Sequence, residues 1–229
     1  MSPKLDLTVV HSSDLHLCGG SDAGDLRALK DVLAVATKLA ADLVLLAGDV
    51  FDHNRVPLPI LDTVTDLLAA CGLQVVILPG NHDCLVPDSV YRRGGLAEPE
   101  NVHVLGISED ECVYLPALDL EVWGRPHHTY SDMTPLHLDR PRSSRWQIAM
   151  AHGHWFQGKH DAHRSYLIRD EQVAACSADY IALGHWDRPL QIGDGSVPAY
   201  YSGSPQFAKT VNVIRLGPAG VRVSREPLM

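Results

Sequence analysis

Carboxylate, imidazole and amide side chains recur in this sequence directly after apolar stretches of strand length. Their oxygen and nitrogen atoms are common protein ligands of divalent metal ions. It is implausible that several strand ends all carry such side chains by chance. The pattern therefore indicates one metal site assembled from several strands. In chain order the segments are Asp14-x-His16, Gly48-Asp49-x-x-Asp52, Gly80-Asn81-His82-Asp83, His152 and Gly184-His185-x-Asp187.

Asp49 is at the centre of this pattern. The run from Asp42 to Ala47 is apolar after its first residue, which is typical of a strand covered on both faces by helices. Gly48 then permits a tight turn, so Asp49 should project from the carboxyl end of that strand, where open α/β sheets keep their sites. A capping Asp in a turn would be the simpler interpretation of an isolated Gly-Asp pair, but the other segments favour a metal ligand.

Helices must return the chain between these strands. Between residues 25 and 40, leucine and alanine recur at three- and four-residue spacings, which predicts an amphipathic helix. A second helix is expected from about Leu58, with Pro59 near its start and Gly72 as its stop. A third, short helix is expected over residues 169–176. Strands that alternate with helices in this way predict a parallel βαβ arrangement.

The signals are weaker in the second half of the chain. Between residues 85 and 101 no element is clearly indicated, and Arg92-Arg93-Gly94-Gly95 indicates a loop beside the site. Residues 125–142, rich in Pro, His and Asp, predict a long loop. Short strands separated by turns predict a second, more antiparallel sheet, and further strands should close the fold. These strands are expected over residues 102–105, 111–115, 118–123, 146–151, 197–202, 211–216 and 221–224.

Composition limits the class of protein. The chain has 229 residues, 45% hydrophobic and 21% charged, which suits one enzyme domain over residues 1–229. No signal-length or membrane-length apolar run is present, so a cytoplasmic protein is expected. The five cysteines are scattered and form no C-x-x-C pair, which indicates neither disulfides nor a structural zinc site. The net charge of −9 argues against a broad basic face for duplex nucleic acid, although bound metal ions would offset it locally.

The ordered series of motifs resembles the binuclear, calcineurin-like metallophosphoesterase superfamily. It looks most like the branch that contains the SbcD-type DNA repair nucleases, because Leu183-Gly184-His185-Trp186 is followed by Tyr201-Ser202-Gly203-Ser204-Pro205. The resemblance extends from about Val9 to Pro205. It implies a four-layer αββα sandwich, in which two mixed β-sheets are flanked by helices and the metal site lies at the carboxyl ends of the strands.

The resemblance also implies a ligand set for two divalent metal ions. Asp49 would bridge them, since a carboxylate has two oxygens and an imidazole cannot bridge in this way. Mixed nitrogen and oxygen donors without thiolate suit Mn²⁺, with iron or zinc as alternatives. By motif, the remaining ligands are Asp14, His16 and Asp187 for one ion and Asn81, His152 and His185 for the other.

Asp187 departs from the SbcD pattern, which has a second histidine at this position. Two interpretations are open. The carboxylate of Asp187 binds the metal ion, or its side chain points away and pairs with Arg188 or another basic group. By resemblance, His82 matches the general acid of the family, and Asp52 matches the carboxylate that orients this histidine. The nucleophile implied by the resemblance is a hydroxide that bridges the two metal ions and attacks phosphorus. Arg125, His127, His128 and His154 are candidate phosphate contacts, with solvated loops as the competing interpretation.

The leading hypothesis is a metal-dependent phosphodiesterase acting on nucleic acid, a DNA exo- or endonuclease that prefers single strands or ends. A hydrolase of cyclic nucleotides, dinucleotides or phosphomonoesters is the alternative, which the acidic charge favours. A non-catalytic protein-binding scaffold is a third hypothesis, disfavoured because His82 and nearly every ligand are present. The chain ends soon after the resemblance does, which makes partnership with a coiled-coil ATPase doubtful, and no membrane partner is expected.

Overall fold

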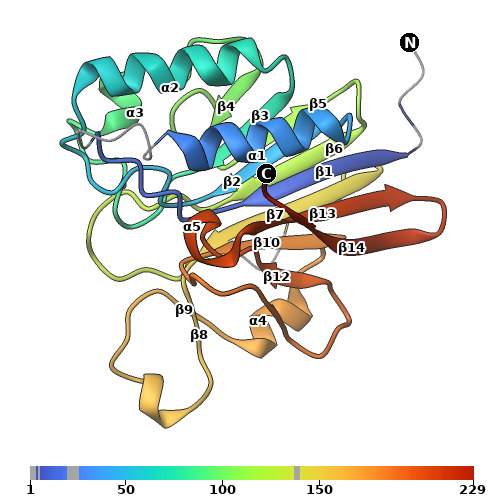
Figure 1. The fold of residues 1–229 in the computed structure, drawn as a ribbon. Helices are drawn as coiled ribbons and strands as arrows, with labels where there is room; N and C mark the ends of the chain where they lie inside the picture. Colours follow the sequence, from blue (N-terminus) through green and yellow to red (C-terminus); the bar gives the residue numbers. More distant parts are fainter. Residues whose placement is uncertain (1–3, 5, 20–25, 137–139) are drawn as a thin grey trace.

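The apolar run that precedes Asp49 forms a central strand of the first of two stacked sheets. The computed structural model describes residues 4, 6–19, 26–136 and 140–229 (Figure 1). In the first sheet β1 to β4 are parallel, and β13 and β14 add to β1 as an antiparallel hairpin. Its order is β14 (Gly220–Pro227), β13 (Thr210–Gly217), β1 (Leu7–Ser12), β2 (Leu43–Ala47), β3 (Gln74–Leu78) and β4 (Val102–Val104).

The second sheet is parallel at its centre, so the expectation of a more antiparallel sheet was wrong. Strands β6, β7, β10 and β12 run parallel, and only β5 and β11 at the edges are antiparallel. The central strands β6, β7 and β10 are buried along their whole length, as is typical of parallel strands covered on both faces. The order is β11 (Leu190–Ile192), β12 (Ala199–Tyr201), β10 (Tyr180–Gly184), β7 (Trp146–His152), β6 (Leu120–Gly124) and β5 (Cys112–Leu115).

Strand β4 also corrects the expectation, because it pairs with β3 in the first sheet and not with the strands that follow it. The segment expected as a loop before it contains a short helix, α3 (Val90–Arg93). The buried side chain of Asn54 accepts a hydrogen bond from the backbone N–H of Val90 at 3.0 Å. A partner distant in sequence therefore stabilises the start of this helix, which local periodicity does not reveal.

Helices cover the outer faces of both sheets, which confirms the expected fold class of two mixed sheets flanked by helices (Figure 1). The helices α1 and α2 lie on the first sheet, and α4 lies beside the second, where a short helix was expected. A two-stranded ribbon of β8 and β9 extends from the second sheet. The bounds are α1 (Arg27–Lys38), α2 (Leu58–Ala70), α4 (Asp170–Ala175), α5 (Pro205–Ala208), β8 (His154–Trp155) and β9 (Leu167–Ile168).

Strand β2 shows why its sequence is apolar throughout. Val44 and Leu46 face the helices, whereas Leu43, Leu45 and Ala47 face the second sheet, and all five are fully buried. Successive side chains of a strand point to opposite faces, so a strand between two apolar layers needs apolar residues at every position. Burying one such Leu stabilises the fold by roughly 2 kcal/mol.

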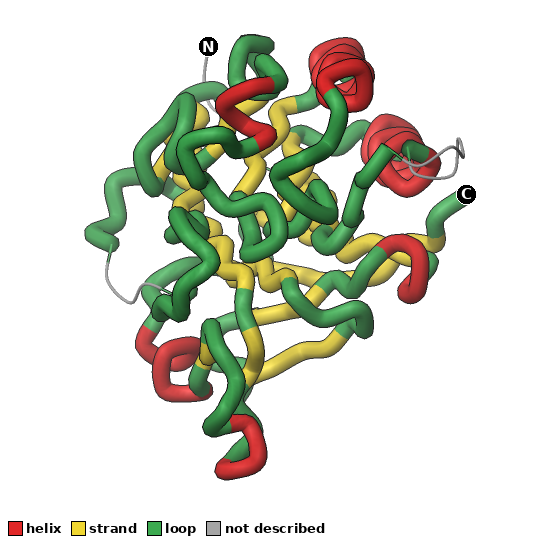
Figure 2. Tube along the Cα trace, turned by 90° about the vertical axis from the view of Figure 1, so that its left-hand side faces the viewer, coloured by secondary structure: helices red, strands yellow, loops and turns green. Residues whose placement is uncertain are grey.

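The carboxyl ends of β1, β2 and β3 lie at one edge of the first sheet, and those of β7 and β10 at the neighbouring edge of the second. Contacts between β10 and β2, and between β7 and both β2 and β3, join the two sheets. Seen from this side, loops cross in front of the strand ends (Figure 2). The fold therefore gathers the loops that carry the predicted ligands.

Candidate metal centre

Four predicted ligands have a left-handed backbone conformation, which is uncommon for residues other than glycine. The φ angles are 55° at Asp14, 49° at His16, 51° at Asp49 and 102° at His185. Hydrogen bonds between loops hold these residues, since Asp14 N–H donates to Gly48 O and His16 N–H to Asp49 O, each at 3.0 Å. Backbone strain of this kind persists where the surroundings enforce it, and it clusters at functional sites.

Three glycines lie directly against the ligand side chains. A Cβ atom at Gly48 would lie 2.0 Å from His152 Nδ1, and one at Gly80 would lie 2.2 Å from Asp49 Oδ1. At Gly184 it would lie 1.9 Å from the carbonyl oxygen of Ala47. No side chain fits at these positions, so packing requires the glycine of the Gly-Asp, Gly-Asn and Gly-His pairs. At Gly48 the backbone also requires it, because its φ angle is 89°.

The closest group of donors surrounds His152. Its Nε2 lies 3.1 Å from Asp49 Oδ2 and 3.1 Å from Asn81 Oδ1, and Asn81 Oδ1 lies 3.1 Å from His185 Nδ1. Its other nitrogen, Nδ1, donates to Ala47 O at 2.9 Å. If the His152 imidazole were neutral, the lone pair of Nε2 would face the oxygens of Asp49 and Asn81. This arrangement is favourable only when a proton or a metal ion is bound at Nε2.

The charges agree with a cation at this position. Burial would lower the pKa of His152, but the Asp49 carboxylate outweighs burial and raises this pKa to about 10. Burial raises the pKa of Asp14, and that of Asp49 is held below its usual value because His152 outweighs burial. A buried imidazolium between two carboxylates carries the positive charge that a bound metal ion would otherwise supply. The residues present therefore fit a metal ion.

A second group of donors shares Asp49 with the first. Asp14, His16 and Asp49 each offer a ligand atom within 4.8 Å of the others, as do Asp49, His152 and His185. Asp14 is buried, and both of its carboxylate oxygens accept from the backbone N–H of His185 at 3.0 Å. Two neighbouring groups with one common carboxylate match the arrangement of a dinuclear site.

Asp187 lies apart from both groups. Its side chain is exposed, and among the described residues it belongs to neither cluster of metal donors. Its backbone carbonyl oxygen accepts from Ser204 N–H at 3.1 Å, which fixes the chain at this point. Ligation by Asp187 stays a prediction.

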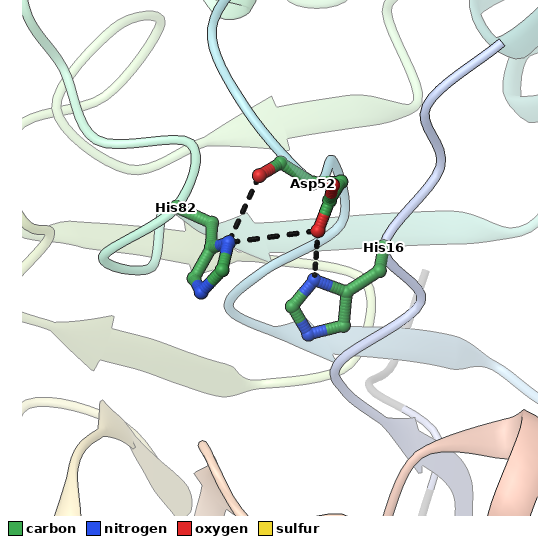
Figure 3. A group of neighbouring side chains, drawn as sticks. All are labelled: His16, Asp52 and His82. Atoms are coloured by element: carbon green, nitrogen blue, oxygen red, sulfur yellow. Dashed lines mark hydrogen bonds and ion pairs between the residues drawn. The ribbon is translucent and has the colours of Figure 1, made fainter.

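His82 and Asp52 lie together at the rim of the site (Figure 3). The His82 backbone N–H donates to Asp49 Oδ1 at 2.9 Å, and its Nδ1 lies 2.9 Å from the carbonyl oxygen of Asp52. The Asp52 carboxylate is 3.6 Å from His82 Nδ1 but 3.1 Å from His16 Nδ1. The main chain of Asp52 thus orients His82, while its side chain contacts a predicted metal ligand. With Nδ1 as donor, Nε2 of the exposed His82 ring is left for a substrate.

Asp83, the last residue of the Gly-Asn-His-Asp motif, has a structural role that was not predicted from the sequence. Its carboxylate is fully buried and accepts from Gly80 N–H at 2.7 Å, Phe51 N–H at 3.1 Å and Tyr91 Oη at 2.6 Å. Burial, followed by the Asp49 charge, raises the pKa of Asp83 to about 6. Asp83 fastens the loop that carries His82 to the loop after β2. Its position in the motif was the only available signal.

The predicted phosphate contacts have different surroundings. His127 is buried and its Nε2 donates to His152 O at 2.8 Å, so it supports a ligand and does not face a phosphate. His154 is buried, its Nε2 lies 3.4 Å from Asp161 Oδ1, and its Nδ1 accepts from Trp186 Nε1 at 3.2 Å. Arg125 lies 3.6 Å from Glu111, and His128 is exposed. The assignment of Arg125, His128 and His154 to substrate binding stays a prediction.

Two mixed sheets with carboxylate, imidazole and amide donors at their strand ends are an arrangement that suits a metal-dependent hydrolase. A sequence model described as calcineurin-like phosphoesterase matches residues 7–189, and the chain belongs to this family. The described residues include no helix long and apolar enough to cross a membrane.

Two relatives come from Bacillus subtilis. The chain is 25% identical over 228 residues to the uncharacterized metallophosphoesterase YhaO, a match that covers 88% of this chain and 53% of the relative. It is 24% identical over an alignment of 276 residues to the SbcD component of the nuclease SbcCD, covering 97% of this chain and 70% of the relative. The chain thus spans about half the length of the first relative.

Among solved structures, TT1561 of Thermus thermophilus superposes with a TM-score of 0.64. The sequence identity is 14%, and the match covers 99% of this chain and all of that one. At this identity the similarity shows a common fold.

Proposed function

We propose that this chain is a metal-dependent phosphodiesterase that hydrolyses nucleic acid. The observation that carries the proposal is the position of His82, an exposed imidazole fixed through Nδ1 and bordering a groove of about 610 Å³ beside the metal donors. A general acid that faces an open groove suits an ester whose leaving group is large. The 24% identity with a component of a nuclease across 97% of this chain supports nucleic acid as the substrate.

Each metal ion would have its own donors and share Asp49. Asn81, His152 and His185 would hold one ion with Asp49, and Asp14 and His16 would hold the other. When bound, two such ions activate water for attack on phosphorus and neutralise the charge of the phosphate. The donor set supports Mn²⁺ as the native metal, since it contains carboxylate, imidazole and amide groups and no thiolate.

His82 would transfer a proton to the leaving oxygen. Its Nδ1–H donates to the carbonyl oxygen of Asp52, so a proton on Nε2 is the one available for transfer. Asp49 Oδ1 accepts a hydrogen bond from the backbone N–H of His82 at 2.9 Å. Both contacts restrict the orientation of the ring, as positioned proton transfer requires.

A small-molecule phosphoesterase is the second candidate, because the net charge of −9 disfavours extended contact with a polyanion. The two are separated by Mn²⁺-dependent hydrolysis of labelled single-stranded DNA, duplex DNA and bis-p-nitrophenyl phosphate, with Asp49→Ala as the inactive control. A nuclease should cleave single-stranded DNA, and short oligonucleotides should compete with the small diester far better than mononucleotides. Activity on the small diester alone would contradict the proposal.

A non-catalytic scaffold is disfavoured by the family and by the assembled donors. Metal analysis of the purified protein tests this directly. Two transition-metal ions per chain are expected, and a chain that never binds two could not act by this chemistry.

A further inference from the structure

The groove beside His82 is lined by residues 52–55, which follow β2, and by Asn81, Val86, Asp88 and Tyr130. Because His82 faces this groove, a group attached to an oxygen that His82 protonates must lie within it. The groove is therefore the place for the leaving part of the substrate, provided that the proposed function is correct.

Tyr130 presents an unusual combination of exposure and order. Its side chain is 60% exposed, one of the largest apolar exposures among the described residues. Asn54 Nδ2 nevertheless lies 3.2 Å from Tyr130 Oη, and Tyr166 Oη donates to the Tyr130 carbonyl oxygen at 2.9 Å. Tyr130 is thus held at its hydroxyl group and at its main-chain carbonyl, while much of the residue remains open to solvent.

The residue that holds the ring is itself fixed. Asn54 is buried, donates to Cys84 O at 2.8 Å and accepts from Val90 N–H at 3.0 Å. An exposed aromatic side chain that is ordered before binding loses little conformational entropy when a ligand covers it. This arrangement suits a flat ring that stacks on Tyr130.

The charges of the groove select the kind of ligand. Among the residues that line the groove, Asp52 and Asp88 contribute two carboxylates, and Arg55 contributes one guanidinium. The carboxylates of Asp52 and Asp88 would repel a further phosphate in the groove, whereas an uncharged aromatic ring would experience no such repulsion. We propose that this groove binds the nucleoside that leaves, with its base stacked on Tyr130.

The test compares two phosphodiesters that differ only in the leaving group. One is a dinucleotide, and the other carries an abasic sugar in place of the leaving nucleoside, so that the acidity of the leaving oxygen is nearly unchanged. The wild-type protein should show kcat/KM on the order of 10-fold higher for the dinucleotide, since every base can stack on an aromatic ring. Tyr130→Leu should abolish this preference by lowering kcat/KM for the dinucleotide to about that for the abasic substrate, while Tyr130→Trp should keep the preference.

Tyr114→Leu is the matched control, because Tyr114 is also an exposed tyrosine, at 48%, but lies on β5 and does not line the groove. Hydrolysis of bis-p-nitrophenyl phosphate by each variant shows that the fold and the metal site are intact. Two results with a wild type that cleaves the dinucleotide would overturn this inference and leave the proposed function standing. In one, Tyr130→Leu keeps the preference for the base; in the other, its kcat/KM falls equally on both substrates. If the wild type hydrolyses the p-nitrophenyl diester but neither the dinucleotide nor DNA, the proposed function itself fails.

Discussion

The carboxylate of Asp52 lies 3.1 Å from His16 Nδ1 and so contacts a predicted metal ligand more closely than the predicted general acid. A carboxylate that accepts from the second nitrogen of a ligating imidazole orients the ring and increases its basicity. Asp52→Asn should therefore lower the Mn²⁺ affinity of one site, by about 10- to 100-fold. Calorimetric titration of the metal-free protein measures this. Unchanged affinity with reduced turnover would show instead that Asp52 acts only on His82.

Removal of the His82 imidazole should separate substrates by their leaving group. His82→Ala should lose about 10²- to 10⁴-fold in kcat on diesters with alkoxide leaving groups, because these need a proton. Activated p-nitrophenyl esters should lose much less, and two metal ions per chain should remain bound. Equal losses on both kinds of ester, or loss of metal, would reassign His82 as a ligand or a structural residue.

Asp187 and Asp14 allow a comparison of an exposed and a buried carboxylate at the same predicted metal. Asp187→Ala should weaken metal binding less than Asp14→Ala, because water screens the charge of an exposed group. Asp187→His should move the metal preference toward zinc or iron, since imidazole replaces an anionic oxygen. Metal content measured at defined free concentrations of Mn²⁺ and Zn²⁺ tests both expectations. Unchanged occupancy in Asp187→Ala would assign this coordination position to solvent.

The hydrogen bond from Tyr91 to the buried Asp83 should contribute to stability. Tyr91→Phe leaves a buried carboxylate with one donor fewer, which should lower the free energy of unfolding by about 1–3 kcal/mol. Urea denaturation of the metal-free protein measures the change. Tyr200→Phe is the control, because the Tyr200 hydroxyl bonds to Gln191 at an exposed position and should contribute less. A Tyr91→Phe effect no larger than that of the control would contradict this role.

His11 should make the metal-free fold sensitive to acid. Burial lowers the pKa of this fully buried imidazole to about 3, from an ordinary value of 6.5. Between these pH values the unfolded chain binds a proton that the folded chain does not, so this contribution to stability is present above pH 6.5 and is lost as the pH falls toward 3. The loss is at most about 1.4 kcal/mol per pH unit. The substitution His11→Gln keeps a hydrogen-bonding group next to Tyr180 Oη. The free energy of unfolding of this variant should fall less between pH 7 and pH 5 than that of the wild type. Equal slopes would contradict the assignment.

The sequence by itself determined the parallel βαβ arrangement of the first sheet and the positions of the strand-end side chains, and its resemblance to the phosphoesterase family implied the two-sheet fold class. The apolar run before Asp49 and the glycine after it are local features, and a continuously apolar strand fits only between two covered faces. Because parallel strands end at one edge, residues as distant as Asp49 and His152 could be expected to meet there, and they do.

Only the tertiary structure decided how the strands pair and what each side chain contacts. The side-chain periodicity of a short strand does not indicate which strand it pairs with or in which direction. Neither the parallel centre of the second sheet nor the pairing of β4 with β3 could therefore be predicted from it. The partner of the Asp52 carboxylate depends on a difference of half an ångström between His16 and His82, which no sequence spacing specifies. At the groove, Asn54 donates a hydrogen bond to the hydroxyl group of Tyr130, 76 positions later in the chain, and such contacts arise only when distant segments pack together.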